Sequence, residues 1–400
     1  MDILIVGAGI GGLAAALCAA HFGHRVTVLE RADALREIGA GIQLPPNAMR
    51  VFRELDLEAK IARDAFASEA IQARMGESGR TLFTIPLAAQ AEDRWGAPYL
   101  HIHRADYVRA LAGALERRAP GALRLGAEVA RYRNVESAVE IELATGEALR
   151  ADVLIGADGV HSGVRAQMLG PDSPRFTGNV AWRAVVPVEA LGKHAPAPTA
   201  CAWMGRGRHA VTYRLRGGRL ANFVGVVERH DWPRKGASGE SWTERGSKTD
   251  LLADFAGWHP VIRALVEAAP EDGLFRWALL DRAPLPRWTD GRAALLGDAA
   301  HPMLPFLAQG AAMAVEDAWV LARELSRGGD VGSALSRYEH ARAPRTARAQ
   351  AGSRANMGTF HQRTAWGRLL TYGPMWLAGR LAPSLVHRQM DWLYGFDVTA

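Results

Sequence analysis

The first thirty residues contain the feature that most constrains the fold. An apolar run, Ile3–Val6, precedes glycines at positions 7, 9 and 12; an alanine-rich stretch and a second apolar run follow. In this spacing Gly7 permits a tight turn, Gly9 lets the backbone approach a pyrophosphate, and Gly12 lets helix pack closely on strand. The helix N-terminus offers N–H groups to phosphates, and Glu30, after the second run, can accept bonds from ribose hydroxyls. This order predicts a dinucleotide site, without distinguishing FAD from NAD.

Length and composition exclude several other classes. A chain of 400 residues is too long for one typical core and predicts more than one domain. The net charge is +6, but the arginines are scattered, which argues against nucleic-acid binding. Two cysteines, Cys18 and Cys201, provide neither a disulfide framework nor a zinc site, so we expect buried thiols and no metal. With no recognisable signal peptide or transmembrane-length apolar run, we expect a cytoplasmic protein without stable membrane insertion.

Two kinds of pattern alternate along the rest of the chain. Residues 151–169 repeat the order of apolar strand, glycine turn and helix, whereas 173–280 hold alternating strands typical of an antiparallel sheet. No second G-x-G-x-x-G is present, so we expect one tightly held dinucleotide and only a transient second one. The predicted fold class is α/β with an α+β insert: a Rossmann-like nucleotide-binding domain (1–72, 99–172 and 281–330), a substrate-domain sheet (73–98 and 173–280) and C-terminal helices (331–400).

A second unusual stretch lies at residues 293–325. A short apolar strand ends at Asp298, a proline-rich loop follows, and a long helix begins near Gly310. An acid at the carboxyl end of such a strand points into the ligand crevice and can bond a polyol or ribityl chain. The helix N-terminus would face a ligand oxygen or a developing anion. The alternative is a loop that only packs, with His301 buried and satisfied.

Three motifs together resemble those of single-component (class A) flavoprotein aromatic hydroxylases. They are the N-terminal glycine motif with Glu30, the "GADGVHSGVR" of 156–165 and the "GDAAHPMLPFLAQGAAMAVEDA" of 297–318. The similarity extends over nearly the whole chain and is greatest to the group containing salicylate hydroxylase, 3-hydroxybenzoate 6-hydroxylase and 6-hydroxynicotinate 3-monooxygenase. The motifs specify the class and say little about the substrate.

The resemblance implies tightly bound FAD and assigns it a set of residues. The backbone of the glycine turn, with Glu30 and Arg31, would hold the ADP half, and Val129 would meet the adenine. Arg104 would lie near the diphosphate and the ring, while Asp158 is associated in the family with both FAD and NAD(P)H. The residues expected to contact the cofactor are Gly7, Gly9, Ile10, Gly11, Gly12, Glu30, Arg31, Arg104, Val129, Asp158, Asp298, Gly310 and Ala311.

The chemistry implied by the resemblance is hydroxylation with NADH or NADPH and O₂, through a C4a-hydroperoxyflavin. Activating a substrate phenol favours a general base. His209 and Tyr213 lie four apart in a strand pattern and so share a face of the sheet; the spacing resembles the His and Tyr of the 3-hydroxybenzoate 6-hydroxylase branch. We expect His209 to be the base, Tyr213 to position the substrate, and Arg183 to face its anionic group. Pro305 would line the oxygen side of the flavin, where that branch has glutamine.

Alternatives to this interpretation remain open. The chain could instead belong to a related branch that acts on a lipid or quinone ring. Aromatic residues at 360–395 could then support membrane contact, although we expect Trp366, Trp376, Leu377 and Trp392 to pack in the core. A flavin halogenase is not supported, because the sequence lacks the tryptophan motif G-W-x-W-x-I-P of that class. A flavin-binding sensor and a plain NAD dehydrogenase are separable by experiment. The expected partners are a small aromatic acid, O₂ and NAD(P)H; the sequence leaves the oligomeric state open, with a homodimer as one candidate.

Overall fold

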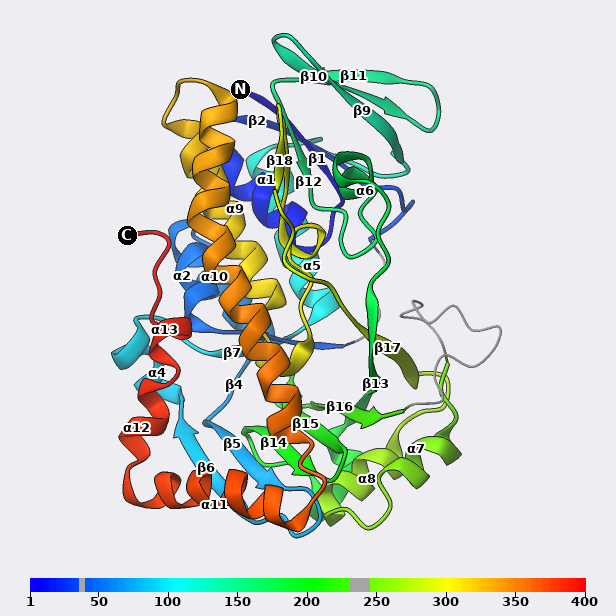
Figure 1. The fold of residues 1–400 in the computed structure, drawn as a ribbon, viewed down its shortest axis with the longest axis vertical. Coiled ribbons are helices and arrows are strands. Elements are labelled where there is room, and N and C mark those ends of the chain that lie inside the picture. The colour runs from blue at the N-terminus through cyan, green and yellow to red at the C-terminus, as the bar shows by residue number, and fades with distance from the viewer. Residues whose placement is uncertain (36–39, 230–244) are drawn as a thin grey trace.

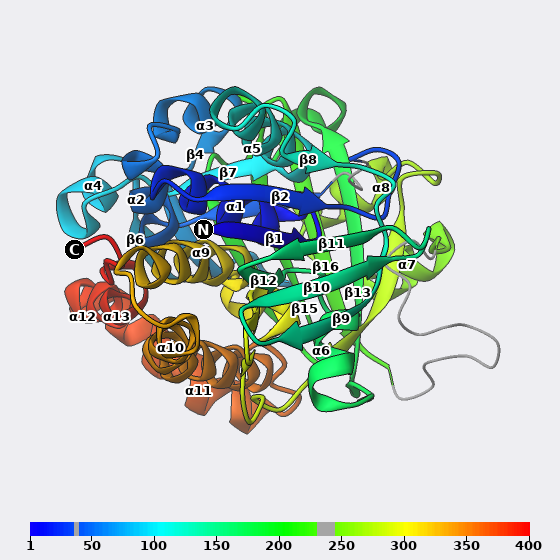
Figure 2. The same cartoon turned by 90° about the horizontal axis from the view of Figure 1, so that it is seen from above.

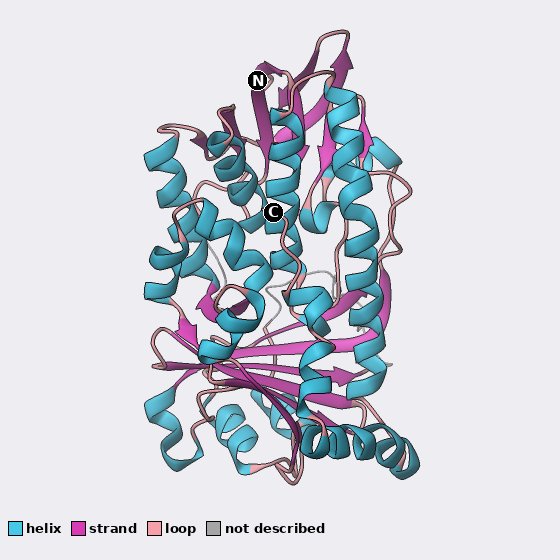
Figure 3. Cartoon of the chain, turned by 90° about the vertical axis from the view of Figure 1, so that its left-hand side faces the viewer, coloured by secondary structure: helices cyan, strands magenta, loops and turns pink. Residues whose placement is uncertain are grey.

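The computed structural model describes residues 1–35, 40–229 and 245–400. Two sheets dominate the molecule: a parallel sheet at one end and a larger sheet towards the other, with helices packed along both (Figures 1 and 3). The mixed α/β class predicted from the sequence is confirmed. Helices α9, α10 and α11 lie on one side of the molecule, and α7 and α8 lie on another (Figure 2).

The N-terminal motif forms the centre of a six-stranded sheet. The central strand β1 pairs in parallel with β2 and β12, and β12 pairs in parallel with β19. The carboxyl ends of these parallel strands therefore lie at one edge, where α/β proteins bind ligands. In spatial order the strands are β18 (Thr289–Asp290), β19 (Ala293–Leu295), β12 (Val153–Gly156), β1 (Asp2–Val6), β2 (Arg25–Leu29) and β8 (Leu123–Arg124).

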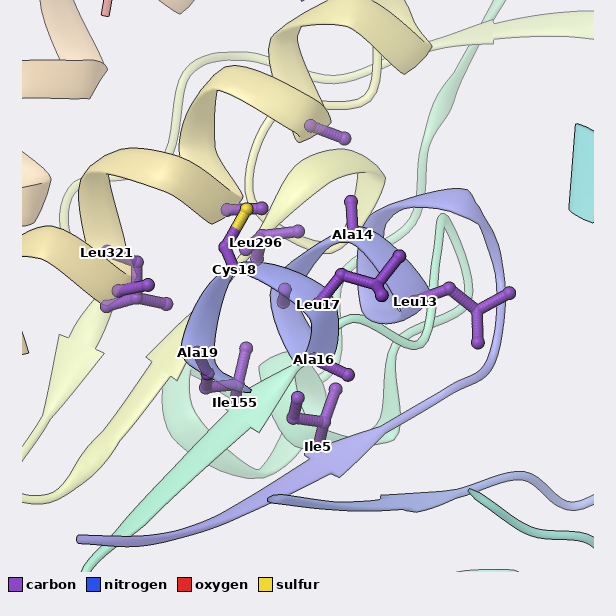
Figure 4. Close-up of a cluster of buried hydrophobic side chains, with 14 of the residues drawn as sticks. Ile5, Leu13, Ala14, Ala16, Leu17, Cys18, Ala19, Ile155, Leu296 and Leu321 are labelled. Atoms are coloured by element: carbon purple, nitrogen blue, oxygen red, sulfur yellow. The ribbon is translucent and has the colours of Figure 1, made fainter. Parts of the chain in front are cut away.

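Helix α1 (Ile10–His21) is buried around most of its circumference, as expected for a helix inside a large core. Its small side chains let it lie against Ile5, Ile155 and Leu296 as well as against α9 (Figure 4). The predicted core thiol Cys18 belongs to this cluster, and Cys201 is also buried and free. Close packing of α1 fixes the position of the glycine turn at its N-terminus.

The second large sheet has seven strands and is mostly antiparallel. One adjacent pair, β14 with β5, is parallel, which departs from the purely antiparallel insert predicted from the alternating pattern. β5 and β6 come from an earlier part of the chain, and their long connection to β14 permits a parallel pairing that a tight hairpin would not. In spatial order the strands are β17 (Phe275–Asp281), β13 (Arg175–Pro187), β16 (Leu220–Glu228), β15 (Arg208–Leu215), β14 (Ala200–Gly205), β5 (Ala70–Met75) and β6 (Thr81–Pro86).

Two small three-stranded sheets and the remaining helices complete the described fold. The sheets are β11 (Ala148–Ala151), β10 (Ala138–Leu143), β9 (Val129–Val135), and β3 (Gly41–Leu44), β7 (Leu100–His103), β4 (Phe66–Ala67). The α-helices other than α1 are α2 (Pro46–Glu54), α3 (Glu58–Asp64), α4 (Ala88–Trp95), α5 (Arg104–Arg118), α6 (Gly163–Leu169), α7 (Lys248–Asp254), α8 (Pro260–Ala268), α9 (Gly310–Ser326), α10 (Val331–Phe360), α11 (Ala365–Leu381), α12 (Pro383–Arg388) and α13 (Asp391–Tyr394).

The C-terminal helices pack less completely than the sequence predicts. Trp376 and Trp392 are partly buried, but Trp366 is 73% exposed and Leu377 is 50% exposed on α11. The expectation of core packing is therefore wrong for these two residues: α11 packs against strand β6 but leaves both side chains exposed. Among the described residues, no helix is long and apolar enough to cross a membrane.

Candidate active site

A cavity of about 310 Å³ lies between the carboxyl edge of the parallel sheet and one face of the seven-stranded sheet. Residues predicted separately for cofactor and for substrate meet around it. From the nucleotide-binding side come Gly9, Ile10, Gly11, Arg104, Asp298, Pro305, Gly310 and Ala311, and from the sheet come Arg183, His209 and Tyr213.

The glycine turn shows which of its three glycines the protein's own packing requires. Gly7 has φ +100°, and a Cβ there would lie 2.6 Å from the Ala157 carbonyl oxygen. A Cβ on Gly12 would overlap the carbonyl oxygen of Gly7. At Gly9, by contrast, φ is −71° and a Cβ would meet no protein atom within 4 Å. The backbone at Gly7 and Gly12 therefore requires glycine for its own packing, whereas Gly9 leaves open space beside the cavity.

The other predicted nucleotide contacts lie near this turn but do not line the cavity. Glu30 accepts hydrogen bonds from the backbone N–H groups of Ala8 (2.8 Å) and Ala32 (3.0 Å), so it ties the turn to the end of β2. Arg31 is exposed and follows it, and Val129 begins β9.

Asp158 lies in the loop after β12. Its Oδ2 accepts a hydrogen bond from the Val164 backbone N–H at 3.1 Å. Its buried Oδ1 has no hydrogen-bond partner within the described part of the chain. An orphaned buried carboxylate oxygen is costly, and its position beside the glycine turn fits a ligand donor.

Asp298 follows β19 at the same edge. Protein surrounds this residue, yet its side chain remains accessible because it opens into the cavity. Burial raises the pKa of the Asp298 carboxyl above its ordinary value, and the neighbouring His301, Arg104 and Arg165 partly oppose the shift. The N-terminus of α9 lies next to it: a Cβ on Gly310 would be 3.7 Å from Asp298 Oδ1. Acceptor and N–H donors thus share one wall of the cavity.

His301 takes no part in lining this cavity. It is buried, and its Nε2 lies 2.5 Å from Asp317 Oδ2 on α9. Arg342 of α10 bonds both Asp317 (2.7 Å) and Glu316 (2.6 Å), which completes a buried ionic cluster. Burial alone would raise the pKa of both carboxyls, but the neighbouring charges hold them below their ordinary values. The alternative in which His301 is buried is therefore correct, but only its Nε2 is satisfied, because its buried Nδ1 has no hydrogen-bond partner among the described residues.

The sheet face contributes side chains at alternate positions. His209, Val211 and Tyr213 of β15 all line the cavity, as the period of two along a strand dictates. Arg183 comes from β13, and its guanidinium lies 4.7 Å from the ring centre of Trp277. The surface is thus largely apolar, with one cation and two groups able to hydrogen-bond.

His209 is 2% exposed and packs against the rings of Phe306 and Phe360, each with centroids 5.1 Å away. Burial lowers the pKa of His209 well below its ordinary value, and the nearby His361 adds to the effect. A neutral imidazole is the form that can accept a proton.

Tyr213 is held from two sides. Its ring stacks on His101 with centroids 4.5 Å apart, and a side chain at Gly41 would collide with it. Gly41 is in turn fixed by a 2.9 Å bond from its N–H to Asn222 Oδ1. Burial raises the pKa of Tyr213, so its hydroxyl stays protonated at neutral pH.

A second, larger cavity of about 740 Å³ lies beside the 156–165 motif. Arg165 donates to the Val160 carbonyl at 2.6 Å and to Ala299 at 2.9 Å, so the loop that holds Asp158 also borders this groove. Asp172 contacts both Arg165 and Arg282. The cationic residues around the groove are Arg165, Arg175, Arg282 and Arg354.

Residues 1–353 match the family model described as FAD binding domain, and the chain belongs to this family of flavoproteins. It is 37% identical over 401 residues to 6-hydroxynicotinate 3-monooxygenase of Bordetella bronchiseptica, with 100% of this chain and 96% of that protein covered. It is 38% identical over 396 residues to 3-hydroxybenzoate 6-hydroxylase 1 of Aquipseudomonas alcaligenes, covering 98% and 97%.

Solved structures agree. Klebsiella pneumoniae HpxO complexed with FAD and uric acid superposes with a TM-score of 0.86 at 26% identity, covering 99% of this chain and 97% of that one. A salicylate hydroxylase substrate complex gives 0.81 at 25% identity, covering 100% and 96%. The resemblance inferred from three motifs is confirmed, and the chain is a monooxygenase of the FAD-dependent class.

Several cavity residues were not predicted from the sequence. Strand alternation could have indicated Val224 and Val226, which face His209 and its neighbours from β16. Gln43, Trp277 and Gln309 carry no local signal, because each reaches the cavity only through the packing of distant elements.

Proposed function

We propose that this chain hydroxylates a small hydroxylated aromatic acid of the hydroxybenzoate or hydroxynicotinate type. FAD would be the tightly bound cofactor, NADH or NADPH the transient reductant, and O₂ the second substrate. The observation that carries the proposal is the single cavity in which the glycine turn and the α9 N-terminus face His209, Tyr213 and Arg183. The names of the relatives, which include 6-hydroxynicotinate and 3-hydroxybenzoate hydroxylases, support the choice of substrate class.

The residues present fit FAD. The open space at Gly9, at a helix N-terminus, suits a pyrophosphate. The orphaned Oδ1 of Asp158 and the accessible carboxylate of Asp298 can accept hydrogen bonds from the hydroxyls of a polyol chain. Reduced FAD would supply the activation of O₂ that transfers one oxygen atom to an electron-rich ring. The N–H groups at Gly310 and Ala311 would stabilise negative charge at the adjoining edge of the ligand.

On the sheet side each polar residue has a proposed task. Arg183 would attract the substrate carboxylate, Tyr213 would donate its hydroxyl proton to the carboxylate or ring oxygen, and neutral His209 would remove the substrate's hydroxyl proton. Pro305 would form a rigid wall on the oxygen side. The apolar remainder of the cavity would exclude water during the reaction.

The groove is lined by four arginines and two aspartates, Asp172 and Asp281, and this excess of positive charge suits the phosphates of a visiting nicotinamide dinucleotide. Arg165 donates to the carbonyl of Val160, the residue next to Gly159, which lines the flavin cavity. A dinucleotide in the groove would therefore lie next to the proposed flavin site without needing a second Rossmann domain.

The test is oxidation of NADH and NADPH by the FAD-loaded protein with salicylate, 3- and 4-hydroxybenzoate, 6-hydroxynicotinate and a quinone precursor. We expect one of the acids to stimulate oxidation and to gain one oxygen atom by mass spectrometry. Stimulation by the quinone precursor alone would support the lipid or quinone alternative. Absence of stimulation by every compound would contradict the proposal and favour a flavin-binding sensor.

A further inference from the structure

Three polar side chains connect the cavity to the protein surface. His209 Nδ1 lies 2.7 Å from His361 Nε2, and His361 Nδ1 lies 3.1 Å from Glu228 Oε1. His209 belongs to β15, His361 directly follows α10, and Glu228 ends β16, so distant parts of the chain meet here. Both imidazoles are nearly buried, whereas the Glu228 side chain is 20% exposed and borders a surface hollow of about 370 Å³.

The order of the three residues determines which nitrogen of each imidazole ring carries the proton. A carboxylate only accepts, so Glu228 places the proton of His361 on Nδ1. The Nε2 of His361 is then an acceptor, and the Nδ1–H of His209 donates to it. This leaves the lone pair of His209 on Nε2, the nitrogen not engaged with His361. The chain thus selects the tautomer in which His209 can act as a base toward a ligand.

Burial disfavours the positively charged, doubly protonated form of His209. Aromatic rings of Phe306 and Phe360 surround it, and an imidazolium there would also face His361. The pKa of His361 is itself lowered to about 4 by burial. A charged state on either ring is therefore unfavourable, whereas a proton on Glu228 is within reach of water.

We propose that His361 and Glu228 form a proton relay that carries the substrate's hydroxyl proton from His209 to solvent. This rests on the proposed function. The substrate O–H bond breaks as an N–H bond forms at His209 Nε2, and the proton on His209 Nδ1 passes to His361 Nε2. The proton on His361 Nδ1 passes to the Glu228 carboxylate and then to water. The substrate is left as a phenolate, and neither imidazole retains a charge.

Other ionisable groups face the two ends of this relay and will contribute to any pH dependence. Around the cavity that His209 lines they are Arg183 and Tyr213 on the same sheet wall and Arg104 and Asp298 on the opposite wall. Around Glu228 they are Arg206, Arg208, Arg229, Asp254 and Arg363, of which Arg363 contacts the Glu228 carboxylate directly. The arginines beside Glu228 stabilise its carboxylate, so a proton that reaches Glu228 is readily released to water.

The decisive variant is His361→Gln. A glutamine amide can accept from His209 and donate to Glu228, so it preserves the hydrogen bonds, but it cannot pass a proton on. With 3-hydroxybenzoate or 6-hydroxynicotinate, whichever the wild type oxygenates, we expect kcat at neutral pH to fall at least about tenfold with KM and FAD content unchanged. At a pH where the substrate hydroxyl is already ionised in solution, kcat should return to within about twofold of wild type.

Two further variants provide a second test of the relay, in case His361→Gln does not fold, and a control. Glu228→Gln changes only the partly exposed end of the relay and should show a smaller loss with the same recovery at high pH. His340→Gln, on the exposed part of α10, is the matched control and should behave as wild type at every pH.

The relay would be overturned by wild-type kcat at neutral pH in both relay variants, or by an equal loss at every pH, which would indicate a purely positioning role. If the wild type oxygenates no acid, the proposed function fails first. If it does and the relay variants match it, only the relay fails.

Discussion

The two walls of the cavity present different kinds of chemical group to a ligand. The nucleotide-binding wall is largely backbone: Gly9, Gly11 and Gly310 present main-chain groups at helix N-termini, supported by Asp298. The opposite wall is side chain: His209, Tyr213 and Arg183 project from one face of the seven-stranded sheet. Backbone groups suit a ligand that all members of the class share, whereas side chains can vary with the substrate.

This difference indicates which wall governs cofactor binding and which governs turnover. The glycine turn is a local structure of neighbouring residues, so substitutions there should affect cofactor binding and stability together. The sheet wall assembles strands from distant sequence positions over a rigid scaffold. Substitutions there should affect turnover while leaving the cofactor in place.

The sharpest test of this separation is His209→Ala. We expect turnover to fall about 10²–10⁴-fold, the range for loss of a general base, with FAD content unchanged because His209 lies on the sheet wall. The measurements are the visible absorbance of the bound flavin and product formed per NAD(P)H consumed. Unchanged turnover with normal coupling would remove His209 from the chemistry and weaken the comparison.

The second test is Gly12→Ala in the glycine turn, which supports the opposite wall without itself lining the cavity. A Cβ there would overlap the Gly7 carbonyl oxygen, so we expect about 1–3 kcal/mol of destabilisation from overpacking and a loss of bound FAD. Urea unfolding of the FAD-free protein measures the first, and flavin content after purification measures the second. A variant with full FAD content and wild-type stability would show that the turn tolerates the clash.

Much of the fold and part of the site followed from the sequence for the same reason. The strand–turn–helix at Ile3–Glu30 and the strand before Asp298 are local patterns, and both contribute to the cavity as their positions at strand ends required. Alternation along β15 similarly predicted a shared face for His209 and Tyr213. In each case the residues of one short segment determine the local structure that was predicted.

The rest depends on tertiary packing that a single segment does not encode. His361 meets His209 across 152 positions of sequence, and Gly41 accommodates the ring of Tyr213 only after β3 packs beside β15. The parallel pairing of β5 with β14 and the exposure of Trp366 likewise arise from how elements pack against one another. No spacing rule could have supplied these contacts.

Gly9→Ala separates ligand contact from protein packing on the nucleotide wall. A Cβ at this position meets no protein atom within 4 Å, so the unfolding free energy of the FAD-free protein should stay within about 0.5 kcal/mol of wild type. FAD affinity should fall by about tenfold, or roughly 1.4 kcal/mol, because the methyl group occupies the space proposed for the pyrophosphate. Fluorescence titration of FAD into the apoprotein measures it. Unaltered affinity would place the pyrophosphate elsewhere.

The smallest expected effect is that of Tyr213→Phe on the sheet wall. The ring should keep its place, because stacking on His101 and the close approach of Gly41 hold it without the hydroxyl. Loss of one neutral hydrogen bond to substrate corresponds to about 0.5–1.5 kcal/mol, so KM should rise roughly two- to tenfold while FAD affinity is unchanged. Steady-state kinetics over a substrate series, with and without the carboxylate, would locate the bond: a penalty confined to the acids places the hydroxyl on the carboxylate, and an equal penalty for both places it on the ring oxygen. A loss of FAD would contradict the separation of the two walls, since it would make a sheet residue part of the cofactor site.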